Sequence, residues 1–206
     1  PVLMMTMLDT LHRWTGGLIG LVLALLGLSG TILLHKDAWI GVPHASDPLQ
    51  ADLASLAAAT DRIMALPGAQ GIIYARDGFG LHQARFGEGA GLYADQSGAA
   101  VTRWASQWER PEIWIFDFHH HLFAGDAGEW VIGIAGLCGL FFIVSGAILW
   151  WRTRRTFRPR LWPKRLTRAA IIMHHRDLGI VAAPLLLLSV VPGPTTILPP
   201  FAIAPA

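Results

Sequence analysis

The stretch WTGGLIGLVLALLGLSGTILL, residues 14–34, decides the architecture of this chain. It holds 21 residues without a charge, which as a helix is long enough to cross a hydrocarbon layer of about 30 Å. A cleavable signal segment has a shorter apolar region, roughly 7–15 residues, and a small-residue cleavage site. Here His35, Lys36 and Asp37 follow instead. We therefore interpret residues 8–36 as a retained transmembrane helix.

The composition agrees with a membrane protein that carries a modest polar insert. Of its 206 residues, 53% are apolar and only 15% are charged, whereas a soluble domain carries about 25% charged residues. A second apolar segment is predicted over residues 116–151, including a polar lead-in that a break around Gly125-Asp126 could separate from the apolar part. A third, interrupted by a His-His-Arg-Asp cluster, is predicted over residues 169–191. Residues 192–206 are rich in proline, which cannot continue a helix, and are expected to form a tail.

Residues 41–110 are polar and mixed, and their pattern predicts a small soluble module. Apolar positions at helical spacing predict a short amphipathic helix from Asp52 to Leu66, ended by Pro67-Gly68. Short strands separated by turn residues are predicted after it, at residues 71–76, 81–86 and 92–95. The predicted fold class is a mainly α membrane protein, with three transmembrane helices and a small α+β extracytoplasmic insert between the first and second.

Half of the basic residues lie in one loop, which predicts the orientation. Residues 152–168 contain eight of the 16 Lys and Arg residues and no acidic residue. The positive-inside rule places such a loop in the cytoplasm. The N-terminus is then also cytoplasmic and residues 41–110 lie outside, in the periplasm if the membrane is a bacterial inner membrane. A nucleic-acid patch is the competing interpretation, but the position between two apolar segments disfavours it.

This topology sorts the histidines into two layers. His12, His174 and His175 lie at the cytoplasmic side, whereas His35 and the triplet at 119–121 lie at the outer side. His12 and His35 are separated by 23 positions, about 34 Å of helix. Ionisable groups at the membrane edge indicate function, and two facing histidines on separate helices can bind a haem iron axially. The alternative is that each histidine merely caps a helix or lies at the interface.

One spacing recurs at three of the helix ends: His-x-x-x-Gly, at His12 and Gly16, His121 and Gly125, and His175 and Gly179. Residues four apart share a helix face, so each glycine would leave a flat gap beside the imidazole. Adjacent helix residues diverge by about 100°, so only one histidine of a cluster can face a given partner. The repeated frame selects His175 over His174, and His121 ahead of His120.

Several other polar residues have less specific interpretations. Arg13 and Arg176 could pair with haem propionates, although an interfacial positive charge explains them as well. His44 and His82 lie in the insert and are expected to be solvated. The acidic residues beside the apolar segments are expected to be surface groups or caps, at Asp9, Asp117, Asp126 and Asp177.

The lone cysteine limits how a haem could be held. Cys138 lies inside an apolar segment and no C-x-x-C-H attachment motif exists, so any haem would be non-covalent, of b type. The two histidine layers predict two haems. No flavin or nucleotide motif is present, so an external electron donor, a quinol or a flavoprotein, would be needed. No side chain is assigned a catalytic role.

The chain resembles the PepSY-associated transmembrane family. The resemblance covers about residues 8–191 and rests on LHRWTGGL (11–18), SGTILLHKD (29–37), HLFAG (121–125), SGAILWW (145–151) and HHRDLG (174–179), with an insert, including LYADQSG (92–98), that is similar to a PepSY helix-and-sheet module. Fuller members have a fourth span and a second outer segment, so a truncated or altered C-terminus is expected.

The resemblance implies a function and a ligand set. The family includes bacterial inner-membrane reductases that use b haems to release iron from ferric siderophores. It implies His12 and His175 for a cytoplasmic-side haem, and His35 with His121 for an outer one. The chain would then be a b-type cytochrome that passes electrons across the membrane, with a ferric siderophore as its substrate. The alternative is a non-redox binding or regulatory module that the helices only anchor.

Overall fold

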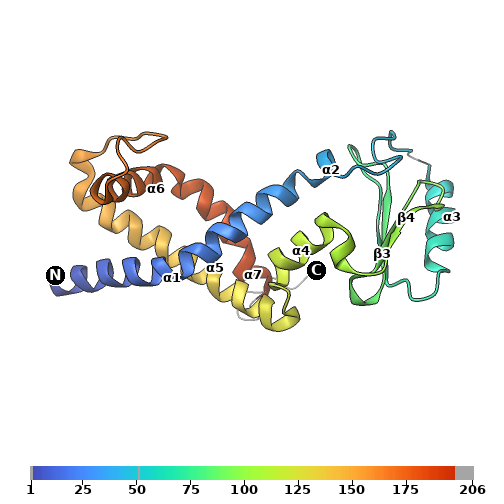
Figure 1. Cartoon of the computed structure of the whole chain (residues 1–206), viewed down its shortest axis with the longest axis horizontal. Helices are drawn as coiled ribbons and strands as arrows, with labels where there is room; N and C mark the ends of the chain where they lie inside the picture. The colour runs from blue at the N-terminus through green and yellow to red at the C-terminus, as the bar shows by residue number, and fades with distance from the viewer. Residues whose placement is uncertain (1, 51, 198–206) are drawn as a thin grey trace. The chain divides into compact units, whose positions relative to one another are not determined.

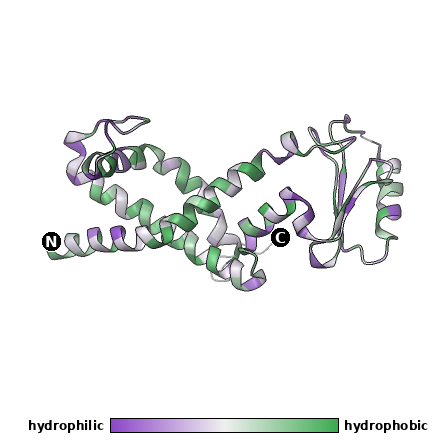
Figure 2. Ribbon diagram, in the orientation of Figure 1, coloured by the Kyte–Doolittle hydropathy of each residue, from purple (hydrophilic) through white to green (hydrophobic). Residues whose placement is uncertain are grey.

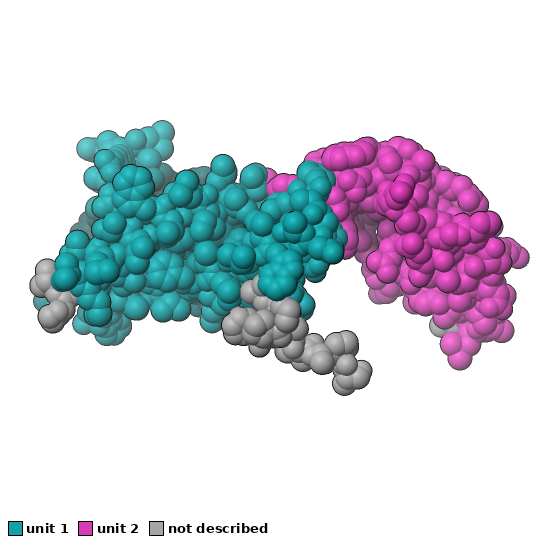
Figure 3. All heavy atoms as spheres, turned by 90° about the horizontal axis from the view of Figure 1, so that it is seen from below, with its two compact units in different colours: residues 1–27, 120–206 teal, residues 28–119 magenta. Residues whose placement is uncertain are grey.

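A computed structural model describes residues 2–50 and 52–197 of the chain. It divides into two compact units, residues 1–27 with 120–206, and residues 28–119 (Figure 3). Three stretches of helix are long and apolar enough to cross a membrane, Leu3–Leu34, Gly125–Thr156 and Arg168–Ile197. A four-stranded antiparallel sheet lies between the first and second of them in sequence. The predicted fold class is therefore confirmed.

The first unit is built from long apolar helices (Figure 1). They are the N-terminal part of α1 (Val2–Leu34), α5 (Gly125–Thr153) and α6 (Arg168–Val190). Figure 2 shows that hydrophobic residues dominate all three. Large side chains on their surfaces are exposed, such as Leu18 at 78% and Leu185 at 68%. A lipid environment accommodates such faces, because hydrocarbon solvates them as well as a protein core does.

The third apolar helix contains a proline in its interior. Pro184 lies inside α6, where it removes one backbone hydrogen bond. Such positions are tolerated in membrane helices, because neighbouring helices and local adjustment satisfy the freed carbonyl. After α6, Pro192–Ile197 forms a short helix, α7, where only a Pro-rich tail was predicted. Proline suits the first turn of a helix, since the amide it lacks would be unpaired there. The remainder of the predicted tail, residues 198–206, lies outside the described residues.

The chain breaks between the lead-in helix α4 (Pro111–His121) and α5. Leu122, Phe123 and Gly125 have φ values of 49°, 61° and 55°, in the left-handed region that a continuous helix cannot use. The segment predicted over residues 116–151, for which the sequence allowed a break around Gly125-Asp126, is thus two helices. His121 is the last residue of α4, and Gly125 is the first of α5.

The second unit is a two-layer module whose sheet is a simple meander, in the order β1 (Gly71–Ile73), β2 (His82–Arg85), β3 (Gly91–Ala94) and β4 (Ala100–Trp104). Strand β4 was not predicted. Helix α3 (Leu53–Met64) begins at Asp52, whose carboxylate accepts a hydrogen bond from the Ser55 amide at 2.9 Å. Such N-caps stabilise a helix start by about 1 kcal/mol.

Both faces of the sheet are covered, because alternate residues of each strand point to opposite sides. On one side Ile63 of α3 packs with Ala84 and Leu92. On the other side Tyr93 packs with the chain that follows α1, including Ile40 and Val42. That chain includes the short helix α2 (Lys36–Trp39), which is tied to the module by an ion pair between Asp37 and Arg76.

Candidate functional site

In the first unit, His12 and His175 lie side by side, although 163 positions separate them in sequence. His12 comes from the N-terminal part of α1 and His175 from α6. Their ring centroids are 6.4 Å apart and the ring planes differ by 57°. His12 is half-buried and His175 is exposed. Of the two adjacent histidines in α6, the structure therefore places the predicted one, His175, beside His12.

The ring of His12 is held by Ser145 on α5. The Ser145 hydroxyl donates to the Phe141 carbonyl at 2.6 Å, so its oxygen is an acceptor toward the histidine. His12 Nδ1 lies 2.7 Å from that oxygen and donates to it. This fixes the tautomer with the proton on Nδ1 and the lone pair on Nε2. Phe142 contacts the ring edge-on at a centroid distance of 5.6 Å, and so restricts its rotation.

Glycine beside this serine lets the imidazole approach the α5 backbone. A Cβ atom at Gly146 would lie 3.4 Å from His12 Cε1, a tight contact. At Gly179, four residues after His175, a Cβ would meet nothing within 4 Å. At Gly16 it would lie 3.8 Å from Phe142. The glycine spacing therefore leaves open space beside His175, but beside His12 it only accommodates an aromatic ring.

The two arginines beside these histidines form protein contacts. Arg13 pairs with Asp9 at 3.5 Å in an exposed ion pair one helical turn away. Arg176 donates to Asp177 at 2.7 Å and to the Thr156 hydroxyl at 2.9 Å. Asp177 was expected to be a surface group or cap, but it is 3% exposed and also accepts the Arg158 amide at 3.0 Å. These bonds tie the basic loop to α6.

At the other end of α1, the candidate residues lie at or beside helix ends. His35 is exposed and follows the last residue of α1. His121 lies at the end of α4, and its ring centroid is 6.1 Å from that of His120. Because the chain breaks after His121, Gly125 does not share a helix face with it. The premise that selected His121 from the triplet is therefore wrong.

Within the second unit, His119 occupies the position that resembles that of His12. Its Nδ1 lies 3.0 Å from Ser29 Oγ on α1, within hydrogen-bond distance. Its ring lies directly against Gly30, where a Cβ atom would come within 2.8 Å of His119 Cε1. In the sequence, His119 is one of three adjacent histidines, and the His-x-x-x-Gly spacing does not distinguish it. The repeated Ser-Gly-x-Ile-Leu at residues 29–33 and 145–149 was the available signal.

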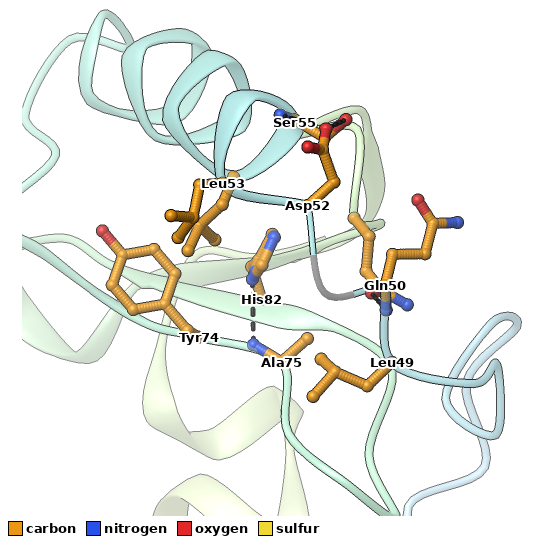
Figure 4. Close-up of a pocket in the computed structure, with 10 residues that line it drawn as sticks. Leu49, Gln50, Asp52, Leu53, Ser55, Tyr74, Ala75 and His82 are labelled. Atoms are coloured by element: carbon orange, nitrogen blue, oxygen red, sulfur yellow. Dashed lines mark hydrogen bonds between the residues drawn. The ribbon is translucent and has the colours of Figure 1, made fainter.

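The second unit also contains a buried histidine, contrary to expectation. His82 was expected to be solvated but is only 3% exposed. It lines a hollow of about 240 Å³ between the start of α3 and the sheet, together with Leu53 and Tyr74 (Figure 4). Its Nδ1 accepts a hydrogen bond from the Ala75 amide at 2.9 Å. Burial lowers the pKa of His82, which keeps the ring neutral. His44, by contrast, is exposed and bonded to Asp47.

The comparisons with known proteins identify the family. The sequence model of the PepSY-associated TM region matches residues 10–205. The chain therefore belongs to the PepSY-associated TM family, as its helix-end motifs predicted. No curated protein and no solved structure matches the chain.

Proposed function

We propose that this member of the PepSY-associated TM family is a b-type cytochrome of the bacterial inner membrane, and that it passes electrons outward to ferric-siderophore iron. The observation that carries the proposal is the pair formed by His12 and His175. A metal–imidazole bond is about 2.0 Å and the ring centre lies roughly 1 Å beyond the nitrogen, so two imidazoles that held one iron between them would have ring centroids roughly 6 Å apart. The observed separation of 6.4 Å fits this arrangement.

The surroundings of His12 also suit an axial ligand. A histidine that binds a metal donates its other ring N–H to a nearby acceptor, which fixes the tautomer and makes the ligand more basic. His12 donates from Nδ1 to Ser145, so Nε2 carries the lone pair. A bound haem would supply one-electron transfer. The residues of this chain would hold it, orient its axial ligands and surround it with apolar side chains.

The direction of transfer rests on the topology proposed from the basic loop. If residues 152–168 are cytoplasmic, the His12 and His175 pair lies near the cytoplasmic face and would receive electrons from a quinol or flavoprotein. The outer histidines would hold a second haem, which would supply the same one-electron chemistry on the side of the substrate. Reduction loosens the substrate's iron, because Fe(II) matches hard oxygen ligands less well than Fe(III) does.

The test is the haem content and spectrum of the purified full chain. We expect a reduced-minus-oxidised spectrum of haem b and two haems per chain. His12→Ala and His175→Ala should each remove the same haem, whereas His174→Ala, one position from the pair, should retain both. A colourless, folded preparation would overturn the proposal and favour a non-redox binding module. Loss of haem in His174→Ala but not in His175→Ala would overturn the ligand assignment alone.

A further inference from the structure

We propose that the two Ser-Gly pairs of this chain are matching imidazole seats, and that they make His119, rather than His121, the positioned ligand of the outer haem. Ser145-Gly146 on α5 holds His12, and Ser29-Gly30 on α1 holds His119. The inference rests on the proposed haem function and deepens it. It concerns which side chains bind the second haem and which side chains orient them.

The two seats share their chemistry and their geometry. In each, a serine hydroxyl lies within hydrogen-bond distance of Nδ1, at 2.7 Å for His12 and 3.0 Å for His119. In each, the next residue is a glycine whose missing side chain admits the ring, at 3.4 Å for Gly146 and 2.8 Å for Gly30. Engagement of Nδ1 directs coordination to Nε2 in both rings. One sequence, Ser-Gly-x-Ile-Leu, thus produces the same local arrangement on two helices.

Helix geometry then separates His119 from His121. Two positions along a helix correspond to about 200°, so the two side chains point to nearly opposite sides of α4. With His119 against Ser29 and Gly30, His121 lies on nearly the opposite side of α4. His120, at about 100° from each, is exposed.

Helix α4 is anchored in a rotation that places His119 against Ser29 and Gly30. Glu112 lies seven positions before His119, which returns it to within about 20° of the same helix face. Glu112 is 3% exposed and accepts hydrogen bonds from the Tyr93 hydroxyl at 3.1 Å and from Arg110 Nε at 2.7 Å. The sheet therefore sets the rotation of α4 through Glu112, and the same face presents His119 to α1.

The ligand assignment is tested by haem stoichiometry in single variants of the full chain. We expect His119→Ala to retain one haem of two, and His121→Ala and His120→Ala to retain both. Retention of both haems in His119→Ala, with loss of one in His121→Ala, would overturn the inference. A wild-type chain without haem would overturn the proposed function together with it, whereas a haem-loaded wild type with the reverse variant pattern overturns this inference alone.

The positioning role of the serines is tested by the midpoint potential and affinity of each haem. A hydrogen bond donated by Nδ1–H to the serine oxygen makes the ligand more basic and stabilises the ferric state, so Ser29→Ala and Ser145→Ala should each raise the potential of one haem and weaken its binding by about 10-fold. Ser→Cys keeps the shape but is only a weak acceptor, so it should shift the potential like Ala. Ser→Thr keeps the hydroxyl, so it should leave the midpoint potential close to that of the wild type.

Matched control residues exist in the long apolar helices. Ser189 on α6 bonds to the Leu185 carbonyl at 3.0 Å, as Ser145 does to Phe141, but no histidine contact is described for it. Ser189→Ala should change neither potential. Gly30→Ala should displace His119. Gly20→Ala, whose Cβ would meet nothing within 4 Å, should leave both potentials unchanged. Unchanged potentials in all four Ser29 and Ser145 variants carrying Ala or Cys would overturn the positioning role.

Discussion

At the scale of single residues, the chain uses the same side chain, histidine, in two physical states. His12 and His119 lie within hydrogen-bond distance of serine hydroxyls in or beside the apolar helices. His82 is buried in the second unit, and its Nδ1 accepts a hydrogen bond from the Ala75 amide. The ring nitrogen that carries the proton therefore differs: at His12 it is Nδ1, and at His82 it is Nε2. The partner of Nδ1, and not the residue type, decides which nitrogen can donate.

His82 makes the second unit sensitive to acid. Burial lowers its pKa below the ordinary value of 6.5, so the unfolded chain takes up a proton before the folded one does. Stability is then complete above about pH 6.5 and falls as the pH drops below that value toward the folded pKa. Protonation of Nδ1 would also remove the acceptor for the Ala75 amide.

We therefore expect the melting temperature of the full chain, followed by tryptophan fluorescence, to fall between pH 7.5 and pH 5. His82→Asn, which offers an amide oxygen in place of Nδ1, should reduce this dependence. His44→Asn is the control, because His44 is exposed, and it should leave the dependence unchanged. An identical pH profile in wild type and His82→Asn would show that another group is responsible.

At the scale of elements, α4 connects the sheet to the histidine triplet. Burial and the neighbouring Glu112 carboxylate raise the pKa of the Tyr93 hydroxyl, so it stays protonated and can donate to Glu112 at ordinary pH. The bond is fully buried. Loss of a donor to a buried carboxylate costs about 1–3 kcal/mol, because the group remains desolvated without its partner.

Tyr93→Phe should accordingly destabilise the second unit by about 2 kcal/mol, measured as a lower melting temperature of the purified chain. If α4 positions His119, the variant should also weaken the outer haem while leaving the His12 and His175 site unchanged. Glu109→Gln serves as the control, since Glu109 is exposed and bonds only weakly, to the Ala105 amide at 3.2 Å. If Tyr93→Phe were as stable as the wild type, Glu112 would not anchor α4 to the sheet.

At the scale of the whole molecule, the distribution of basic residues predicts the orientation in the membrane. The loop of residues 152–168 holds eight basic residues and no acid, and part of it is tied to α6 by Asp177. We propose that this loop is cytoplasmic and the sheet-containing unit is periplasmic. Ser97 is exposed in the turn before β4, which makes it a suitable reporter.

In a Cys138→Ser background, Ser97→Cys should react with a membrane-impermeant thiol reagent in intact spheroplasts. Arg160→Cys, in the exposed basic loop, should react only after lysis. The reverse pattern would invert the topology, and with it the assignment of the His12 and His175 pair to the cytoplasmic face.

The sequence by itself determined the long apolar helices, the helix-and-sheet module and the family, because these depend on hydropathy, turn residues and local motifs. It also selected His12 and His175 through the glycine frame. Only the tertiary structure decided which imidazole meets which serine, that His82 is buried, and that Asp177 binds the basic loop. Each of these depends on a partner between 7 and 133 positions away. The His-x-x-x-Gly spacing does not place His121 and Gly125 on one helix face, because left-handed backbone at Leu122 and Phe123 ends the helix there. Non-glycine residues rarely adopt this conformation, and no local sequence pattern predicts it.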